Sequence, residues 1–292
     1  MHISRLRQTR LASFVDRTED VACFRTFLSE RDKIVFWISG ESGLGKSTLL
    51  TKLVLETLPP ELLVVELSGS TGRQLEPLDL MRTICSRVDP TAFSRFQNAV
   101  SESKENNIVV DVSPSKAVTV GSHANFLNSQ VGSISGVHVE TLNVNITPTP
   151  DSVFAQNEIN RITDLFMDDL SNYCRPPTLI CVDAAERLST RCKSWISQEL
   201  VPALIDRIDN MKLVVCSQEQ PTFSDHFEPF IAVRQLKPVT LDVIKDYLKL
   251  SQVREDLLDG ASQVLFLSSR GNMLVIANIA QGLLALQQSA LR

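Results

Sequence analysis

The chain has 292 residues, of which 43% are hydrophobic and 22% are charged, and its formal net charge is −5. This length and apolar content suit about two globular domains with a substantial buried core. The acidic balance gives no overall attraction for nucleic acid or anionic lipid, so it argues against a nucleic-acid partner. The sequence has no run of 18 uncharged apolar residues, and we therefore expect no membrane span.

Helical and strand patterns alternate in the first third of the chain. Residues 18–29 carry apolar side chains at helical spacing, and Asp16 or Thr18 is the expected helix cap. The helix that follows the first strand should end before Pro59 and Pro60, because proline cannot continue a helix. The expected elements are helices over 18–29, 49–58, 77–88 and 93–100, and strands over 33–39 and 62–67.

Residues 106–150 differ in character from the rest of the chain. Short runs of β-branched residues alternate there with Gly, Ser and Asn, which is typical of an insert rather than of a core element. We expect a β-rich excursion from the core. A small hairpin layer or an edge that binds a partner is the alternative.

The second half returns to alternating elements. Residues 153–173 and 195–208 have the pattern of helices, and residues 178–182 and 212–216 are short apolar runs typical of buried strands. The alternation predicts an α/β fold with a parallel sheet covered by helices on both faces and a ligand site at the carboxyl ends of the strands. The apolar stretch 271–286 contains Asn and Gln and suits a buried helix.

The six cysteines, at positions 23, 85, 174, 181, 192 and 216, form no C-x-x-C pair and show no Cys/His metal spacing. Several of them lie in apolar stretches. They are typical of reduced core thiols, which favours a cytoplasmic protein. The basic N-terminus is not followed by an apolar segment, so it does not resemble a secretory signal.

A glycine-rich loop between the strand over 33–39 and the next helix matches the pattern G-x-x-x-x-G-K-[ST]. Glycines in this pattern let successive backbone N–H groups turn towards the β- and γ-phosphates of a nucleotide, and the helix adds its positive N-terminus. Lys46 supplies a charge to the same phosphates, and the Ser47 hydroxyl is a ligand for Mg²⁺. The predicted phosphate-binding residues are Gly40, Glu41, Ser42, Gly43, Leu44, Gly45, Lys46, Ser47 and Thr48.

A second acidic motif follows the strand over 178–182. Asp183 stands where a strand-end carboxylate can hold Mg²⁺ opposite Ser47, and Glu186 can polarise an attacking water. We expect Lys46, Asp183 and Glu186 to be the catalytic residues. The alternative is that Asp183 caps a helix and that Glu186 is an exposed residue of a first helical turn.

Together these motifs resemble the STAND class of P-loop ATPases, the AAA-related signal-transduction NTPases that include NACHT and NB-ARC modules. The matching segments are Phe14-Val15-Asp16-Arg17, Gly40 to Thr48, Val182 to Glu186, Lys212 to Gln218, Leu236 to Thr240, and Gly271-Asn272-Met273-Leu274. The resemblance covers residues 14 to 286 apart from the insert, and it stops before the winged-helix and sensor regions of the family.

The resemblance implies further nucleotide contacts. Val15 and Arg17 should lie near the base and sugar, Gln218 stands where the family commonly has an arginine that senses the γ-phosphate, and Met273 replaces a proline that closes over the adenine. It also implies a P-loop NTPase domain over 1–235, with the insert at about 106–150, and a helical subdomain over 236–292.

The expected function is that of an ATP-binding signal-transduction switch that hydrolyses ATP slowly with Mg²⁺ and works through protein partners or self-association. A neutral Gln218 cannot offset developing charge as an arginine does, which implies weak turnover. Two alternatives stay open. One is a non-hydrolysing interaction module held together by bound nucleotide, and the other is a DNA-acting AAA+ ATPase.

Overall fold

A computed structural model describes residues 14–15, 17–70, 75–105, 109–110, 144–145, 153–173 and 177–289. The chain divides into two compact units, Met1–Ala92 with Leu170–Arg292, and Phe93–Asp169. Across the described ranges, every helix is too short or too polar to cross a bilayer.

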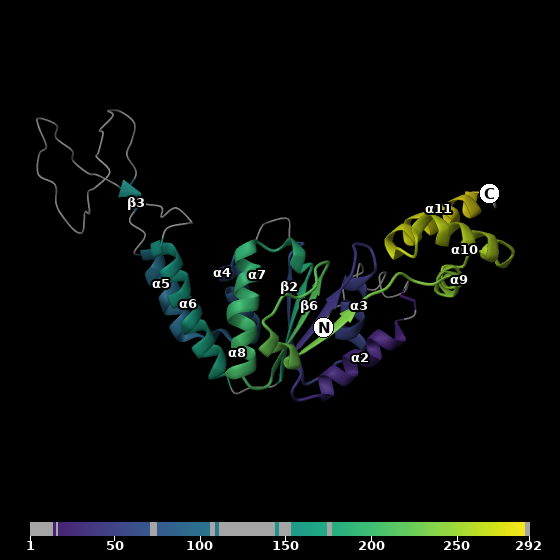
Figure 1. Cartoon of the computed structure of the whole chain (residues 1–292). Helices are drawn as coiled ribbons and strands as arrows, with labels where there is room; N and C mark the ends of the chain where they lie inside the picture. Colours follow the sequence, from purple (N-terminus) through teal and green to yellow (C-terminus); the bar gives the residue numbers. More distant parts are fainter. Residues whose placement is uncertain are drawn as a thin grey trace, which may run out of the picture. The chain divides into compact units, whose positions relative to one another are not determined.

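The first unit is built on a five-stranded sheet in which every strand is parallel to its neighbours, in the order β2-β5-β6-β1-β7 (Figure 1). A parallel pair needs a crossover connection, which explains why helical segments separate the strands in sequence. The strands are β1 (Val35–Ser39), β2 (Leu63–Ser68), β5 (Thr178–Asp183), β6 (Met211–Ser217) and β7 (Ile231–Gln235).

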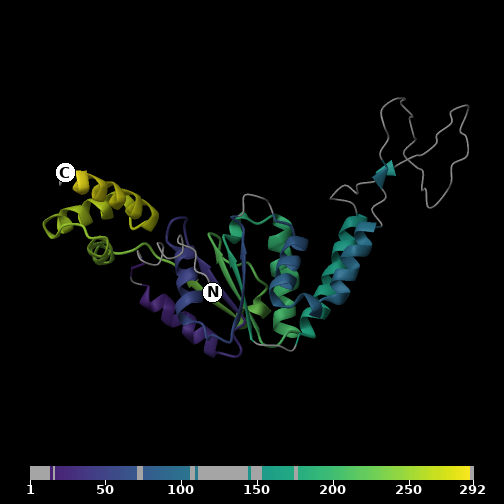
Figure 2. The ribbon, with the colours of Figure 1, turned by 180° about the vertical axis from the view of Figure 1, so that it is seen from behind.

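Helices cover both faces of this sheet, as Figures 1 and 2 show from opposite sides. One face carries α2 (Thr18–Ser29), α3 (Lys46–Lys52) and its continuation η1 (Leu53–Thr57). The other carries α4 (Pro77–Val88), α7 (Thr190–Trp195), η4 (Ile196–Leu200) and α8 (Val201–Asp206). The predicted α/β fold, a parallel sheet covered on both faces, is confirmed.

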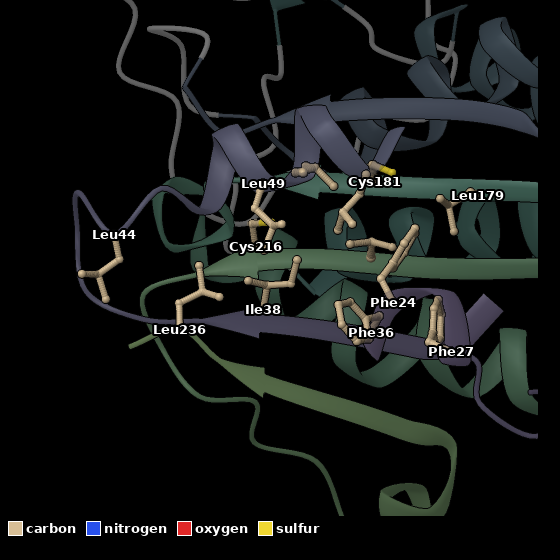
Figure 3. Packing of buried hydrophobic residues seen from close by; sticks show 13 residues of the cluster. Phe24, Phe27, Phe36, Ile38, Leu44, Leu49, Leu179, Cys181, Cys216 and Leu236 are labelled. Atoms are coloured by element: carbon tan, nitrogen blue, oxygen red, sulfur yellow. The ribbon is translucent and has the colours of Figure 1, made fainter. Parts of the chain in front are cut away.

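Three phenylalanines pack together beneath α2 within a larger cluster that also contains aliphatic side chains and two cysteines (Figure 3). Phe24 and Phe27 of α2 pack against Phe36 of β1, with ring centroids 5.5 and 5.2 Å from that of Phe36. Alternate residues of a strand share a face, so Ile38 joins the same cluster as Phe36. Such aromatic contacts add about 0.5–1.5 kcal/mol each beyond the burial of apolar area.

The strand order decides where the functional loops lie. β6 runs between β1 and β5, with Ser39 in register with Ser217 and Val182 in register with Val215. The carboxyl ends of all three strands therefore meet at one edge of the sheet. The loop after β1 and the acidic segment after β5 reach that edge from strands that are not neighbours.

The second unit contains α5 (Ser94–Glu105), most of α6 (Val153–Ser171), and the short antiparallel pair β3 (Val109–Val110) and β4 (Val144–Asn145). Phe93 and Phe96 pack against Phe166, and their ring centroids lie 5.4 and 5.3 Å, respectively, from that of Phe166. The buried carboxylate of Asp169 accepts a hydrogen bond of 2.9 Å from the N–H of Phe96. The rest of the predicted β-rich insert lies outside the described residues.

Three helices follow β7 in the same unit, namely α9 (Leu241–Leu250), α10 (Glu255–Ser269) and α11 (Met273–Ser289) (Figure 1). They pack around an apolar cluster that also takes in Val15. We call these helices the helical subdomain, and the predicted division of the chain at residue 236 stays a prediction. The helix expected over 271–286 is present, but the expectation that it is buried was wrong. Ile276 and Ala280 face the cluster, whereas Leu274 and Leu286 are 57% and 69% exposed. The helix is apolar on several sides and packs on only one of them.

Candidate nucleotide-binding site

The loop between β1 and α3 owes its shape to glycine. Gly43 and Gly45 have φ angles of 85° and 89°, in the left-handed region that other residues rarely adopt. Gly40 also has a positive φ, of 150°, and a Cβ there would lie 3.2 Å from the carbonyl oxygen of Leu236. The three glycines predicted from the sequence are thus required by backbone conformation or by close approach.

The loop presents unpaired donors. The N–H groups of Ser42, Gly43 and Gly45 donate to no acceptor among the described residues. The first turn of α3 adds the free N–H groups that every helix start leaves, together with the positive end of the helix dipole. A cradle of free N–H groups at a helix start fits the phosphates of a nucleotide.

Lys46 lies inside this cradle and is 8% exposed. Its Nζ donates hydrogen bonds to the carbonyl oxygens of Gly40 at 2.6 Å and Glu41 at 2.9 Å. Burial lowers the pKa of the Lys46 ammonium, and the nearby Glu186 is the largest of the charges that oppose this. The structure thus places Lys46 in the predicted loop, where carbonyl oxygens accept hydrogen bonds from its ammonium group.

The two predicted Mg²⁺ ligands meet. Ser47 Oγ donates to Asp183 Oδ1 at 2.8 Å, and the same carboxylate oxygen accepts the N–H of Ala184 at 2.9 Å. Hydroxyl and carboxylate oxygens suit Mg²⁺, which takes few protein ligands and completes its shell with water and phosphate. No cluster of three or more His, Cys, Asp or Glu occurs in the described ranges.

Glu186 lies in the single turn η3 (Ala185–Arg187) and is paired with Gln218 at the end of β6. Its Oε1 accepts from Gln218 Nε2 at 3.0 Å, and its Oε2 accepts from the Gln218 N–H at 3.3 Å. The sequence singled out both residues but did not predict this contact. It orients the Glu186 carboxylate, while roles for the two residues towards a nucleotide stay predictions.

The lead-in segment connects the loop to the helical subdomain. Arg17 donates to the carbonyl oxygens of Leu44 at 2.9 Å and Lys237 at 3.1 Å, and it forms an ion pair with Asp20 at 3.6 Å. Arg17 is the N-cap of α2, so the expectation that Thr18 takes this place was wrong, and Asp16 lies outside the described residues. Because Arg17 stands just before α2, its side chain can extend to the loop and contact Leu44.

At the start of α11, Met273 is partly buried against the apolar cluster of the helical subdomain. Its predicted contact with adenine is a proposal. Asn272, which the sequence placed in the Gly271 turn without a role, touches the phosphate loop: its Nδ2 donates to the Ser42 carbonyl oxygen at 2.8 Å. A turn sequence contains no signal for this contact, because it depends on how α11 meets the loop.

No protein-family profile matches the chain, and no curated protein matches it. Solved structures do match. A STAND protein with a tetratricopeptide repeat sensor from Pyrococcus horikoshii is 12% identical with a TM-score of 0.50, over 90% of this chain and 29% of that one. Cdc6p from Pyrobaculum aerophilum is 15% identical with a TM-score of 0.50, over 95% of this chain and 65% of that one.

A third structure, the Drosophila ORC bound to DNA, is 12% identical with a TM-score of 0.50, over 99% of this chain and 64% of that one. These likenesses agree with the parallel sheet and its loop. The chain has the P-loop NTPase fold. It spans between 29% and 65% of the length of these three structures.

Within the P-loop NTPase fold, the structure brings together the loop residues, Asp183, Glu186 and Gln218 at one edge of the sheet. Arg17 bonds to both the loop and Lys237, and Val15 packs in the apolar cluster of the helical subdomain. The fold itself is shared by proteins of several functions, so the choice of function rests on the site.

Proposed function

We propose that this chain is a nucleotide switch of the STAND type, which binds ATP with Mg²⁺, hydrolyses it slowly, and thereby controls assembly or effector activity. The observation that carries the proposal is the 2.8 Å hydrogen bond between Ser47 and Asp183, at the mouth of a loop with unpaired N–H groups. These are the groups that an ATP-binding P-loop requires, and they are in contact although Ser47 lies in α3 and Asp183 ends β5.

The proposed roles follow from the chemistry of each side chain. Bound Mg²⁺·ATP would supply the γ-phosphoryl group that can pass to water. Lys46 would exchange its carbonyl partners for phosphate oxygens, Ser47 and Asp183 would hold the metal, and Glu186 would accept a proton from the water. Val15, Arg17, Gln218 and Met273 are the proposed further nucleotide contacts.

Slow turnover is supported by the pairing of Glu186 with Gln218. Both carboxylate oxygens accept hydrogen bonds from Gln218, so the base is restrained before any water arrives. The neutral amide of Gln218 also cannot offset charge that develops during hydrolysis. The same observation favours the alternative of a non-hydrolysing module in which nucleotide is structural.

The test is to identify the nucleotide that co-purifies with the protein, and to measure phosphate release and mass in solution with and without ATP. The switch predicts bound ADP or ATP and slow but measurable phosphate release. Tightly retained nucleotide with no release would establish the non-hydrolysing module instead. A protein that binds no nucleotide at all would overturn both readings.

A DNA-acting AAA+ ATPase has equal support from the fold, because the Cdc6p and ORC structures are as similar as the STAND structure. The net charge of −5 opposes it. A gel shift with duplex DNA that weakens as salt increases would favour this alternative over the switch.

Protein partners or self-association are part of the proposal. Both α10 and α11 carry exposed apolar side chains. Among them, Val264 and Leu267 of α10 are 65% and 77% exposed. The mass in solution tests self-association directly. Among the described residues, Cys23, Cys85, Cys181, Cys192 and Cys216 form no disulfide, which supports the proposed cytoplasmic location.

A further inference from the structure

Successive carbonyl groups of the phosphate loop are hydrogen-bonded from outside the loop. Two of the donors belong to the start of α11, and one belongs to the lead-in segment. The pairs are Ser42 O with Asn272 Nδ2 at 2.8 Å, Gly43 O with the Leu274 N–H at 3.1 Å, and Leu44 O with Arg17 Nη2 at 2.9 Å.

These bonds orient the other side of the loop. A trans peptide unit is planar, and its C=O and N–H point in opposite directions. Holding the Ser42 carbonyl towards Asn272 therefore turns the Gly43 N–H the other way, and holding the Leu44 carbonyl towards Arg17 does the same for Gly45. The N–H groups of Gly43 and Gly45 are among those that find no acceptor in the described protein.

Asn272 performs two tasks with the two ends of one side chain. Its Oδ1 accepts from the N–H groups of Leu274 at 3.1 Å and Val275 at 3.3 Å, which caps α11, while its Nδ2 bonds to the loop. The approach is close: a Cβ on Gly43 would lie 2.3 Å from Asn272 Oδ1. The capping task needs only an acceptor, whereas the loop contact needs the amide donor.

We propose that Asn272 is a positioning residue for phosphate binding, which holds the loop in its donor-inward form only while α11 is docked on it. Phosphate in the loop then favours docking of the helical subdomain to the same extent that docking favours phosphate, because coupling between two equilibria is reciprocal. The inference rests on the proposed nucleotide site and names how that site communicates with α11.

The test compares Asn272→Ser and Asn272→Asp with Asn278→Ser, a substitution of another asparagine on the exposed side of α11. Serine and aspartate both keep an acceptor for the helix cap and lose the amide donor. We expect Mg·ADP and Mg·ATP to bind about threefold to tenfold more weakly to Asn272→Ser, as loss of one hydrogen bond implies. Asn272→Asp should bind more weakly still, because its charge repels the phosphates.

A second readout needs no nucleotide. Hydrogen exchange in the segment 40–48 of the free protein should be faster in Asn272→Ser than in the wild type, while exchange along 276–286 stays unchanged because the cap is kept. If Asn272 had only a structural role in α11, its substitution would change hydrogen exchange along 276–286 and not in the segment 40–48.

Two outcomes separate the proposals. If the wild type binds nucleotide and Asn272→Ser binds it equally tightly with unchanged loop exchange, the role of Asn272 is wrong and the nucleotide site stands. If the wild type binds no nucleotide, the proposed function fails, and the exchange measurement alone decides whether Asn272 orders the loop. Equal effects in Asn278→Ser would also overturn the positioning role.

Discussion

At the scale of single residues, the ammonium group of Lys46 is stabilised by carbonyl oxygens of its own loop. Its ammonium is buried with two carbonyl partners, and burial lowers its pKa, so the charge is poorly solvated and ready to accept an anion. The residue that we propose to bind phosphate is thus held in place without phosphate, which reduces the cost of ordering it on binding.

Replacement of Lys46 by alanine should weaken nucleotide binding by on the order of 100-fold, since at least one charge-assisted hydrogen bond is lost. The free protein should keep its fold and nearly its melting temperature, because the Lys46 ammonium donates hydrogen bonds only to carbonyl oxygens of the loop among the described residues. Lys52→Ala, in the same helix but paired with Glu56 at 2.8 Å, is the matched control. Normal nucleotide affinity in Lys46→Ala would sink the site assignment.

Replacement of Glu186 by glutamine should leave ATP binding intact and lower phosphate release by about 100-fold, the effect of removing a general base. Glu219→Gln serves as the control, because Glu219 follows the neighbouring strand β6 and pairs with Lys193 at the surface. Turnover that is unchanged in Glu186→Gln would move the water-activating role to another residue.

Gly43 and Gly45 offer a comparison within one loop. Their φ angles are almost equal, so alanine imposes similar backbone strain of about 1–2 kcal/mol at either position. Only Gly43 is crowded by Asn272, whereas a Cβ on Gly45 meets nothing within 4 Å. We therefore expect Gly43→Ala to lower the free energy of unfolding more than Gly45→Ala in urea titrations, and Asn272→Ser to restore part of the difference. Equal losses would show that crowding by Asn272 is absent.

At the scale of elements, the sequence predicted what local patterns control. Apolar runs located β1, β2, β5 and β6, and the glycine loop located the start of α3, because burial and loop chemistry act over a few residues. It missed β7, an edge strand in which Ile231 alone is buried, and it did not single out α10 within the predicted helical subdomain. Each has an apolar run of only four residues, 230–233 and 264–267, and such a short run does not by itself distinguish a strand from a helix.

The candidate site was predicted unevenly for the same reason. The pairing of Ser47 with Asp183 followed from two motifs that are each local. The contacts Glu186–Gln218 and Ser42–Asn272 were not predictable, since they join segments separated by 32 and 230 residues and depend on strand order and on the position of α11. Patterns identify residues that can act, and tertiary structure decides which of them meet.

Lys212 illustrates a contact between elements that is purely structural. From β6 its Nζ donates to the carbonyl oxygens of Phe27 at 2.8 Å and Lys33 at 2.7 Å, which closes the end of α2 and the connection to β1. Lys212→Met keeps the apolar stem and loses these bonds, so we expect the free energy of unfolding to fall by about 1–3 kcal/mol. Lys249→Met, on an exposed position of α9, should change it little in the same denaturant titrations. If only Lys249→Met lowered the free energy of unfolding, the structural role of Lys212 would be contradicted.

At the scale of the whole molecule, the phosphate loop is bonded to the sheet through β1 and to the helical subdomain through Arg17 and Asn272. A ligand shifts a conformational equilibrium only by its different affinity for the two states. Because the loop contacts both the sheet and the helical subdomain, phosphates bound in it can have different affinities for two arrangements of these parts. This difference in affinity is the physical basis of the proposed switch.

The most direct test is the distance between spin labels on Cys23, the exposed cysteine of α2, and on Ser268→Cys, at an exposed position of α10, with Cys174→Ser in the background. Pulsed electron spin resonance would compare the free protein with its Mg·ADP and Mg·ATP forms. The switch predicts different distance distributions for the ADP and ATP forms. Identical distributions in all three, with nucleotide binding confirmed by calorimetry on the same sample, would contradict it.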